Sequence, residues 1–230
     1  MKNLVVLTGS GISSESGLRT FREMGGLWEE YDVMEVASPQ AWDSDMELVL
    51  RFYNERRKQL ISAKPNPGHI GLAELEKYFN VEIITQNVDD LHERAGSTNI
   101  LHLHGELKKV RSTTDPSLIY ELDGWELKAG DTCEKGSQLR PHIVWFGEAV
   151  PAIETAIEIV QKADILAIIG TSMVVYPAAG LINYVSSSTP IFVIDPNDVQ
   201  TPYHKNINFI KEKASVGVTI LLEKLLAYQN

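Results

Sequence analysis

Two apolar runs that resemble strands lead into polar side chains able to do acid–base chemistry. The first is followed by Gln86, Asn87 and Asp89, and the second contains His102 and His104. Ligands gather at the carboxyl ends of strands in open α/β sheets, and a neutral histidine there is a reasonable general base. We expect one histidine to face a cleft and the other to pack. From spacing alone, each is more often structural than catalytic.

A glycine-rich turn follows the first apolar run, in Val5-Val6-Leu7-Thr8-Gly9-Ser10-Gly11-Ile12-Ser13. Glycines at a strand-to-helix turn let the backbone approach a pyrophosphate, although a plain tight turn explains the pattern about equally well. A hydride-transferring dehydrogenase would carry a third glycine where Ser14 stands, and an acid at the end of its second strand. Both features are missing, so we expect a dinucleotide used for other chemistry.

The elements that must position these residues alternate between strand and helix. Continuous Val- and Ile-rich runs are typical of parallel strands buried on both faces. We expect a doubly wound, Rossmann-like α/β sheet. The expected strands are Leu4–Leu7, Val81–Thr85, Ile100–Leu103, Ile165–Ile169, Ile191–Ile194 and Ile207–Ile210, and the expected helices are Met46–Ile61, Pro151–Ala163, Tyr176–Val185 and Val216–Tyr228.

Two segments interrupt this alternation and predict a smaller inserted module. Residues 23–64 include an amphipathic helix, and residues 108–139 are polar and rich in turn signals. We therefore expect one catalytic domain over residues 1–230, whose large Rossmann-like part comprises residues 1–22, 65–107 and 140–230.

Composition excludes several classes of protein. The 230 residues carry 21 Lys and Arg against 31 Asp and Glu, and this net charge of -10 disfavours direct binding to nucleic acid. Cys133 is the only cysteine, so an intrachain disulfide is excluded. No apolar stretch approaches the ~20 residues of a membrane-spanning helix, and the N-terminal run is too short for a signal peptide. We expect a cytoplasmic enzyme with no membrane partner.

Several motifs together resemble the sirtuin family of NAD-dependent protein lysine deacylases, in its compact bacterial form. They extend over nearly the whole chain in the order of the family. They are Thr8-Gly9-Ser10-Gly11-Ile12-Ser13 with Phe21-Arg22, Thr85-Gln86-Asn87-Val88-Asp89-Asp90-Leu91-His92, His104-Gly105-Glu106-Leu107, Val144-Trp145-Phe146-Gly147-Glu148, and Gly170-Thr171-Ser172 with Val175-Tyr176-Pro177.

The resemblance implies a role for each matched residue. His104 matches the catalytic base, and Asn87 and Asp89 match catalytic residues that hold the nicotinamide carboxamide and a water. Residues implied to bind NAD are Gly9, Ser10, Gly11, Phe21, Arg22, Gln86, Asn87, Asp89, His104, Gly170, Thr171, Ser172 and Asp195, with Ser10 in place of the commoner alanine and Asp195 in place of the usual asparagine. Val144, Phe146, Gly147 and Glu148 match the cleft that binds the acylated peptide as an added strand.

The implied reaction transfers the acyl group of a protein lysine to NAD-derived ADP-ribose. The acyl oxygen attacks the nicotinamide ribose, nicotinamide leaves, and the products are the free lysine and O-acyl-ADP-ribose. Two alternatives remain open from the sequence. One is a mono-ADP-ribosyltransferase that uses the same cofactor cleavage, and the other is a catalytically silent module that binds NAD or peptide.

Tyr53 and Arg56 stand three residues apart on the expected helix Met46–Ile61, so they face one side of it. A guanidinium can grip a carboxylate while a phenol adds a further hydrogen bond. Taken alone, the pair reads more readily as a core tyrosine beside a surface arginine. The sirtuin branch that removes succinyl and other acidic acyl groups carries this Tyr-x-x-Arg spacing, with a small residue at the position of Ala37. The resemblance thus implies substrates that include acidic acyl-lysine.

The chain departs from the family at its zinc site. Sirtuins usually hold a structural zinc with two Cys-x-x-Cys pairs. Here Ser112 and Asp115 stand near the place of the first pair, and Cys133 and Gly136 at the second. A closed zinc site needs four ligands, mainly cysteine and histidine. We therefore expect residues 108–139 to be a degenerate zinc-ribbon-like segment without metal, so that the chain has no metal ligands.

Overall fold

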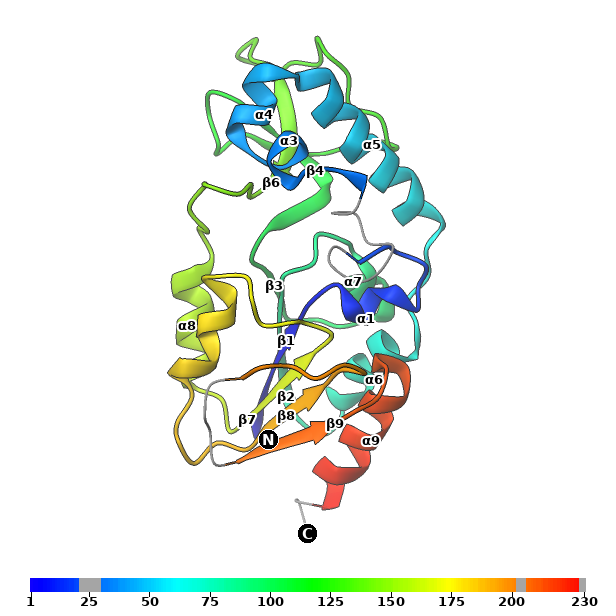
Figure 1. The fold of residues 1–230 in the computed structure, drawn as a ribbon, viewed down its shortest axis with the longest axis vertical. Coiled ribbons are helices and arrows are strands. Elements are labelled where there is room, and N and C mark those ends of the chain that lie inside the picture. Colours follow the sequence, from blue (N-terminus) through cyan, green and yellow to red (C-terminus); the bar gives the residue numbers. More distant parts are fainter. Residues whose placement is uncertain (21–29, 202–205, 228–230) are drawn as a thin grey trace.

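The computed structural model describes residues 1–20, 30–201 and 206–227. Figure 1 shows a parallel sheet with its helices in the lower half and a smaller module of helices and short strands above it. The chain passes between the two parts several times. No helix among the described residues is both long and apolar enough to cross a membrane.

The large part is built on a six-stranded parallel sheet with the order β3-β2-β1-β7-β8-β9. All six apolar runs from the sequence are strands of this sheet, which confirms the doubly wound, Rossmann-like α/β class. Because β1 pairs with β2 on one side and β7 on the other, the order of winding reverses between β1 and β7. The strands are β1 (Asn3–Thr8), β2 (Asn80–Thr85), β3 (Ile100–His102), β7 (Ile165–Ile169), β8 (Ile191–Ile194) and β9 (Ile207–Ile210).

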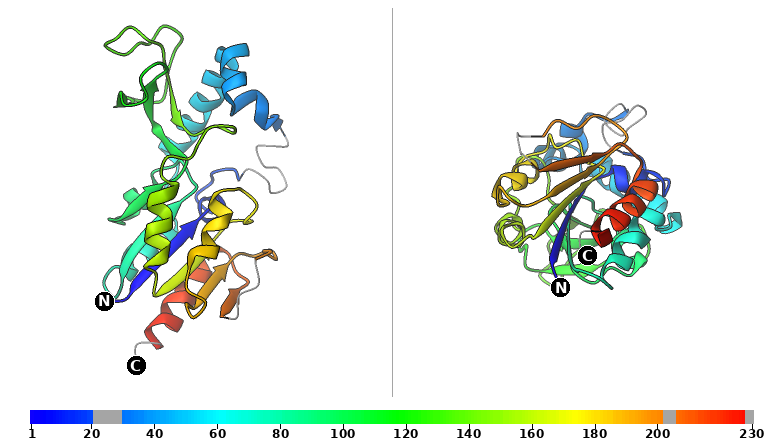
Figure 2. Two further views of the ribbon diagram at one scale, coloured as in Figure 1. Left: turned by 90° about the vertical axis from the view of Figure 1, so that its left-hand side faces the viewer. Right: turned by 90° about the horizontal axis from the view of Figure 1, so that it is seen from below.

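Helices cover both faces of this sheet, as the end-on view in Figure 2 shows. Leu4 and Val6 of β1 pack with α6 (Pro67–Leu75) and α9 (Ala214–Ala227). Val5 and Leu7 point the other way, toward α8 (Ile153–Gln161) and the 3-10 helix η1 (Ala178–Tyr184). Burying each such side chain contributes about 1.5 to 3 kcal/mol, so both faces of β1 stabilise the sheet.

The helix expected over Tyr176–Val185 forms as the tighter 3-10 type. Gly180 donates its N–H to the carbonyl of Pro177, three residues back, at 2.9 Å. The expected positions of the other long helices agree with α5 (Met46–Ser62), α8 and α9 to within a few residues.

The smaller module combines helices with a three-stranded antiparallel sheet of order β5-β4-β6. Its helices are α3 (Val33–Val36), α4 (Pro39–Ser44) and α5 (Met46–Ser62), and its strands are β4 (Gly105–Ser112), β5 (Ile119–Glu121) and β6 (Leu139–Ile143). Strands β4 and β6 extend a few residues beyond the segment 108–139, into the connections with the parallel sheet. Two short helices, α1 (Gly11–Ser14) and α7 (Leu91–Ala95), lie near the junction of the two parts.

Arg57 fastens α5 to β4, and Asn54 fastens it to the loop between β5 and β6. The Asn54 amide donates to the Leu127 carbonyl at 2.9 Å, and its oxygen accepts from the Leu127 N–H at 3.0 Å. The fully buried Arg57 donates to the Leu107 carbonyl in β4 at 2.6 Å and to Asn54 at 2.7 Å. The face of α5 that bears Tyr53 and Arg56 is therefore held at a fixed orientation.

The residues near the family's zinc positions do not fit a zinc ion. The thiol of Cys133 donates to the Ser112 hydroxyl at 3.5 Å, and the carboxylate of Asp115 is paired with Lys135 at 2.7 Å. Gly136 offers no side chain. Among residues 1–20, 30–201 and 206–227, no group of three or more His, Cys, Asp or Glu residues is arranged to hold a metal. Hydrogen bonds and an ion pair cross the segment instead.

We predict that the purified protein contains well under one zinc per chain and keeps its fold in a strong chelator. Zinc-dependent domains unfold without metal because metal binding supplies their folding free energy. Here hydrogen bonds and an ion pair within the chain join the residues at the corresponding place. Elemental analysis and circular dichroism with and without chelator check this. Stoichiometric zinc, or unfolding in chelator, would contradict it.

His69 is a fully buried histidine that caps α6. Its Nδ1 accepts from the Asn66 N–H at 3.4 Å, so Nε2 carries the proton and faces the Ser13 hydroxyl, also at 3.4 Å. Burial lowers the pKa of His69 from 6.5 to about 4. The ring is therefore neutral in the folded protein over a pH range in which an unfolded histidine is charged.

This difference predicts that the free energy of unfolding falls by about 3 kcal/mol as the pH drops from about 6.5 to about 4 through His69 alone. The stabilisation is fully present above 6.5, because below that value the unfolded chain takes up a proton that folded His69 does not. Urea unfolding at several pH values measures the slope. His69→Gln should flatten it, and an unchanged slope in that variant would assign the effect to other groups.

Candidate active site

A cavity of about 360 Å³ lies between the carboxyl edge of the parallel sheet and the smaller module. The sheet contributes residues that follow the ends of β1, β2, β7 and β8, around the point where the winding reverses. The module contributes residues of α5, residues around α3, and the loop after β6. Residues from the sequence motifs that line the cavity are Gly9, Ser10, Gly11, Gln86, Asn87, His104, Gly170, Thr171, Ser172, Asp195, Ala37, Tyr53, Arg56, Val144, Phe146, Gly147 and Glu148.

Two turns meet backbone to backbone at the floor of this cavity. A Cβ on Gly11 would lie 2.7 Å from Cα of Gly170, and a Cβ on Gly170 would lie 2.4 Å from the Ile12 nitrogen. Gly170 also has a φ of +61°, which L side chains rarely adopt. Glycine at these positions lets the ends of β1 and β7 touch, so that backbone and hydroxyl groups line the wall.

His104 lines the cavity and is half-buried. Its Nδ1 lies 3.0 Å from the Gln86 carbonyl, which can only accept, so Nδ1 carries the proton and Nε2 keeps its lone pair. Burial lowers the pKa of His104, and the carbonyl contact only partly opposes this effect. The imidazole is therefore neutral at pH 7 and able to accept a proton at Nε2.

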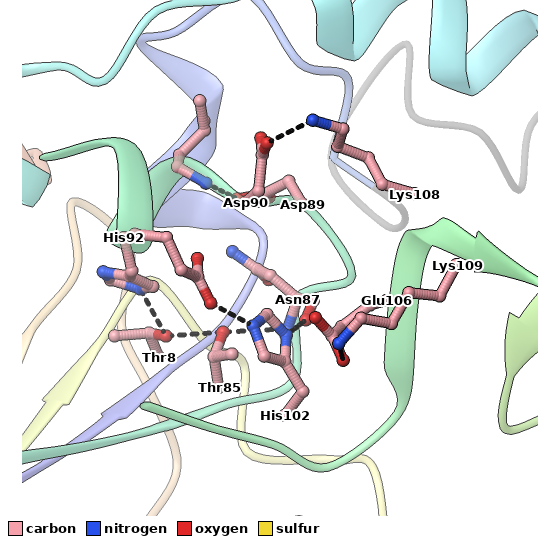
Figure 3. A network of polar contacts seen from close by, with 12 residues as sticks. Thr8, Thr85, Asn87, Asp89, Asp90, His92, His102, Glu106, Lys108 and Lys109 are labelled. Carbon is pink, nitrogen blue, oxygen red and sulfur yellow. Dashed lines mark hydrogen bonds and ion pairs between the residues drawn. The ribbon is translucent and has the colours of Figure 1, made fainter. Parts of the chain in front are cut away.

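His102 is turned away from the cavity, although residues two positions apart in a regular strand face the same side. β3 ends at His102 and the chain bends at residues 103 and 104, so the two rings can face different ways. Its Nδ1 lies 3.0 Å from the Asn87 carbonyl and its Nε2 lies 2.7 Å from a Glu93 carboxylate oxygen (Figure 3). Burial lowers the pKa of His102, but the contacts with Glu93 and Asn87 raise it more, and the net pKa lies above its ordinary value. Both ring nitrogens are occupied, and the ring braces the backbone of Asn87.

Asn87 is held by both of its amide hydrogens. Nδ2 donates to the Gly9 carbonyl and to the Ser13 hydroxyl, each at 3.1 Å, so Oδ1 remains for a ligand. The Asn87 N–H donates to the Thr85 hydroxyl at 3.0 Å, and Thr85 in turn accepts from Thr8 (Figure 3). These bonds tie the residue to the ends of β1 and β2.

Asp89 lies in a smaller adjoining pocket of about 20 Å³, not in the main cavity. One carboxylate oxygen accepts from the Ser13 hydroxyl at 3.0 Å and the other from the Leu91 N–H at 3.2 Å. Burial raises the pKa of Asp89, and these two hydrogen bonds oppose the rise. Ser10, Arg56, Asn87 and Val88 line both pockets, so the pocket of Asp89 adjoins the main cavity at these residues.

The charged and hydroxyl groups at the module end of the cavity include Tyr53 and Arg56 on α5, which lie among apolar side chains such as Phe52, Ile143 and Phe146. The exposed fraction of Tyr53 is 3%, and its oxygen accepts from the Trp145 indole N–H at 3.0 Å. The Arg56 guanidinium carbon lies 5.6 Å from the centre of the Phe52 ring. Burial lowers the pKa of Arg56, whereas Tyr53 and Asp89 raise it. A guanidinium stays charged at pH 7, so this end of the cavity presents one cation beside one hydroxyl.

The loop after β6 forms another wall of the cavity. Val144 donates its N–H to the His104 carbonyl, and Phe146 donates to the Ala37 carbonyl, both at 2.9 Å. Glu148 lines the cavity, but its carboxylate is taken up by Arg140 at 2.7 Å and by the Trp145 N–H at 2.8 Å. Glu148 therefore fixes the shape of the loop.

The structure brings the sequence-derived residues that it describes together around the cavity, except Asp89, which lies in the adjoining smaller pocket. Phe21 and Arg22 lie outside the described residues. Sequence reasoning missed Ser13, which joins Asn87 and Asp89, and Trp145, which contacts Tyr53. Both stand inside motifs that the sequence displays, but their partners are distant along the chain.

The donor set fits NAD. Hydroxyls of Ser10, Thr171 and Ser172 and the backbone of the glycine turns suit phosphates and ribose oxygens, and the Asp195 carboxylate suits ribose hydroxyls. The Gln86 amide is anchored on Thr171 at 3.1 Å. These groups lie at the carboxyl ends of the strands around the β1/β7 reversal, where dinucleotides bind in sheets of this type.

Solved structures of similar sequence share this architecture. One Sir2 homologue, a mutant in complex with ADP-ribose, matches with a TM-score of 0.89 and 41% identity over 98% of this chain and 94% of its own. A Sir2 homologue in complex with NAD gives a TM-score of 0.89 and 40% identity over 100% and 91%. A Sir2 protein bound to an acetylated peptide gives 0.79 and 29% over 96% and 92%.

Protein sequences give the same result. The NAD-dependent protein deacylase of Bacteroides thetaiotaomicron is 57% identical over 98% of this chain and 99% of its own length. The NAD-dependent protein deacylase of Helicobacter pylori is 54% identical over 98% of both. The model of the Sir2 family matches residues 9–177, which include the glycine turn, His104 and the loop after β6. With this match and these relatives, the chain belongs to the Sir2 family.

Proposed function

We propose that this chain removes acetyl, succinyl and related acidic acyl groups from protein lysine with NAD, giving nicotinamide and O-acyl-ADP-ribose. The observation that carries the proposal is a single cavity with two different ends. Around His104, Gln86 and Asn87 the lining is polar and fits NAD. Around Tyr53 and Arg56 the lining is apolar, apart from a cation and a hydroxyl suited to a carboxylate.

His104 is the proposed general base. When bound, NAD supplies a ribose carbon that can accept the acyl oxygen as nicotinamide leaves. The task of His104 is to take a proton from a ribose hydroxyl at Nε2. The Gln86 carbonyl holds the ring in the tautomer that this task requires, and the lowered pKa keeps the ring neutral.

Asn87 and Asp89 are proposed to hold the nicotinamide carboxamide and a water. Asn87 offers Oδ1 as an acceptor because both of its amide hydrogens are already donated. Asp89 and Ser13 form the polar side of the smaller pocket, which adjoins the cavity at Asn87. We assign Phe21 and Arg22 to the cofactor loop from the sequence motif alone.

The acylated lysine is proposed to enter between the loop after β6 and the segment before η1. Phe146 and Tyr176 line the cavity at this opening and are exposed, which suits contact with a peptide. Since both parts of the fold line the cavity, we propose that residues 1–230 act as one catalytic domain, with residues 1–22, 65–107 and 140–230 as its large part. A cytoplasmic location is our proposal from the single cysteine, which is a free, buried thiol.

We predict that His104→Ala lowers kcat by at least ~100-fold, the low end for losing a general base. NAD affinity should change little, because backbone turns, hydroxyls and amides provide most of the cofactor contacts. His102→Ala is the matched control and should be much milder, since its ring contacts Asn87 only at the backbone carbonyl. Steady-state kinetics and NAD titration measure both variants.

The dependence of activity on pH is a second test of His104 as the general base. The base works when neutral, so kcat/KM should fall with decreasing pH at a midpoint below 6.5, the ordinary histidine value that burial lowers in His104. An acid limb above 6.5, or a larger loss of activity from His102→Ala than from His104→Ala, would contradict the assignment.

We predict that Arg56→Met lowers kcat/KM for a succinyl-lysine peptide roughly 10- to 150-fold. A hydrogen bond to a charged group contributes about 1.5 to 3 kcal/mol, and acetyl has no carboxylate to lose. Acetyl turnover should fall far less or rise, because acetyl has no carboxylate for Arg56 to bind and methionine leaves this end of the cavity more apolar. Arg51→Met, an exposed arginine on the same helix, is the control. Equal losses on both peptides would make Arg56 structural and remove the acidic-acyl proposal.

A further inference from the structure

The hydrogen bond between Trp145 and Tyr53 has a fixed direction. The Trp145 indole nitrogen and the Tyr53 oxygen are 3.0 Å apart, and both side chains are buried. An indole N–H is only a donor, so the Tyr53 oxygen must accept and its own proton stays available. Tyr53 therefore lines the cavity with a hydroxyl whose oxygen already accepts one hydrogen bond and whose proton can be donated.

The same bond decides where the Tyr53 proton points. A phenolic O–H prefers the plane of its ring, because the oxygen lone pair is conjugated with the ring, and this leaves two positions. The indole N–H approaches the oxygen and disfavours the position on its own side. The proton then occupies the other position. Because burial raises the pKa of Tyr53 to about 12, the hydroxyl keeps this proton at neutral pH.

Trp145 is itself held rigidly. The Arg140 guanidinium carbon lies 3.3 Å from the centre of the Trp145 ring, and the Trp42 ring lies 5.7 Å away, centre to centre. Arg140 is fixed in turn by its ion pair with Glu148, which also accepts the Trp145 N–H of the backbone. The loop after β6 thus carries a preorganised donor to the face of α5 that bears Tyr53 and Arg56.

We propose that Trp145 is a positioning residue that favours acidic acyl groups by fixing the Tyr53 hydroxyl as a donor to their carboxylate. This inference rests on the proposed removal of acidic acyl groups. Arg56 supplies charge at the same end of the cavity, and Trp145 acts only through Tyr53. A neutral acetyl group has no carboxylate to accept the Tyr53 proton, so the contribution of Trp145 is specific to acidic substrates.

The test compares Trp145→Phe, which keeps an aromatic ring but lacks the N–H, with the wild type on succinyl- and acetyl-lysine peptides. A neutral hydrogen bond contributes about 0.5 to 1.5 kcal/mol, so the ratio of kcat/KM values, succinyl over acetyl, should fall roughly 3- to 10-fold. The loss should appear in KM for the succinyl peptide, because the contact binds a part of the substrate that does not react. Trp42→Phe, which alters packing on the same indole, should leave the ratio near that of the wild type.

A double-mutant cycle separates positioning from packing. In the Tyr53→Phe background the hydroxyl is gone, so adding Trp145→Phe should cause no further fall in the ratio. If Trp145→Phe folds poorly, a benzothienyl analogue of tryptophan can be placed at position 145. It has sulfur in place of the N–H and nearly the same shape. Acetyl turnover and circular dichroism report folding in each case.

The outcomes distinguish this inference from the proposed function. A wild-type enzyme with no activity on succinyl-lysine removes the acidic-acyl function and the role of Trp145 with it. Suppose that succinyl turnover depends on Arg56, but Trp145→Phe lowers kcat/KM for both peptides by the same factor, or lowers the succinyl-over-acetyl ratio further in the Tyr53→Phe background. The proposed function then stands. The role of Trp145 is then wrong.

Discussion

The backbone contact between the turns after β1 and β7 is the constraint on which the active site depends. Gly11 and Gly170 meet with no room for a Cβ on either residue. The carboxyl ends of the two strands can therefore close the floor of the cavity with peptide groups. Asn87 binds the Gly9 carbonyl on the same turn, and the backbone beside it carries Gln86, which orients His104. A side chain at Gly11 or Gly170 would separate the turns and displace this chain of contacts.

The two parts of the fold have separate tasks. The parallel sheet positions the groups that suit NAD and the proposed base, His104, whereas the smaller module positions Tyr53 and Arg56, which we propose to bind the acyl chain. Arg57 fixes α5 to β4 and Asn54 fixes it to the loop between β5 and β6, and these contacts orient Tyr53 and Arg56. The hydrogen bond between Cys133 and Ser112 shows that side chains within residues 108–139 contact one another at this place.

The sequence predicted the parallel sheet well because its inner strands, β1, β2, β7 and β8, are largely buried on both faces and so appear as apolar runs. It predicted that one of His102 and His104 would face the cavity and the other would pack. The reason is not the strand spacing, which would put both on one face, but the bend at residues 103 and 104 after β3 ends at His102. It did not predict the antiparallel sheet, because strand β5 is short and polar and depends on pairing with β4. The contact between Tyr53 and Trp145 joins residues 92 positions apart, and no local pattern indicates such a pair.

The central claim is that one cavity brings NAD and an acylated lysine together for acyl transfer to ADP-ribose. Mass spectrometry of the products from a succinyl-lysine peptide and NAD tests this claim most directly. The account predicts nicotinamide, free lysine peptide and O-succinyl-ADP-ribose in equal amounts. Release of nicotinamide with the lysine still succinylated, or ADP-ribose attached to protein, would contradict it.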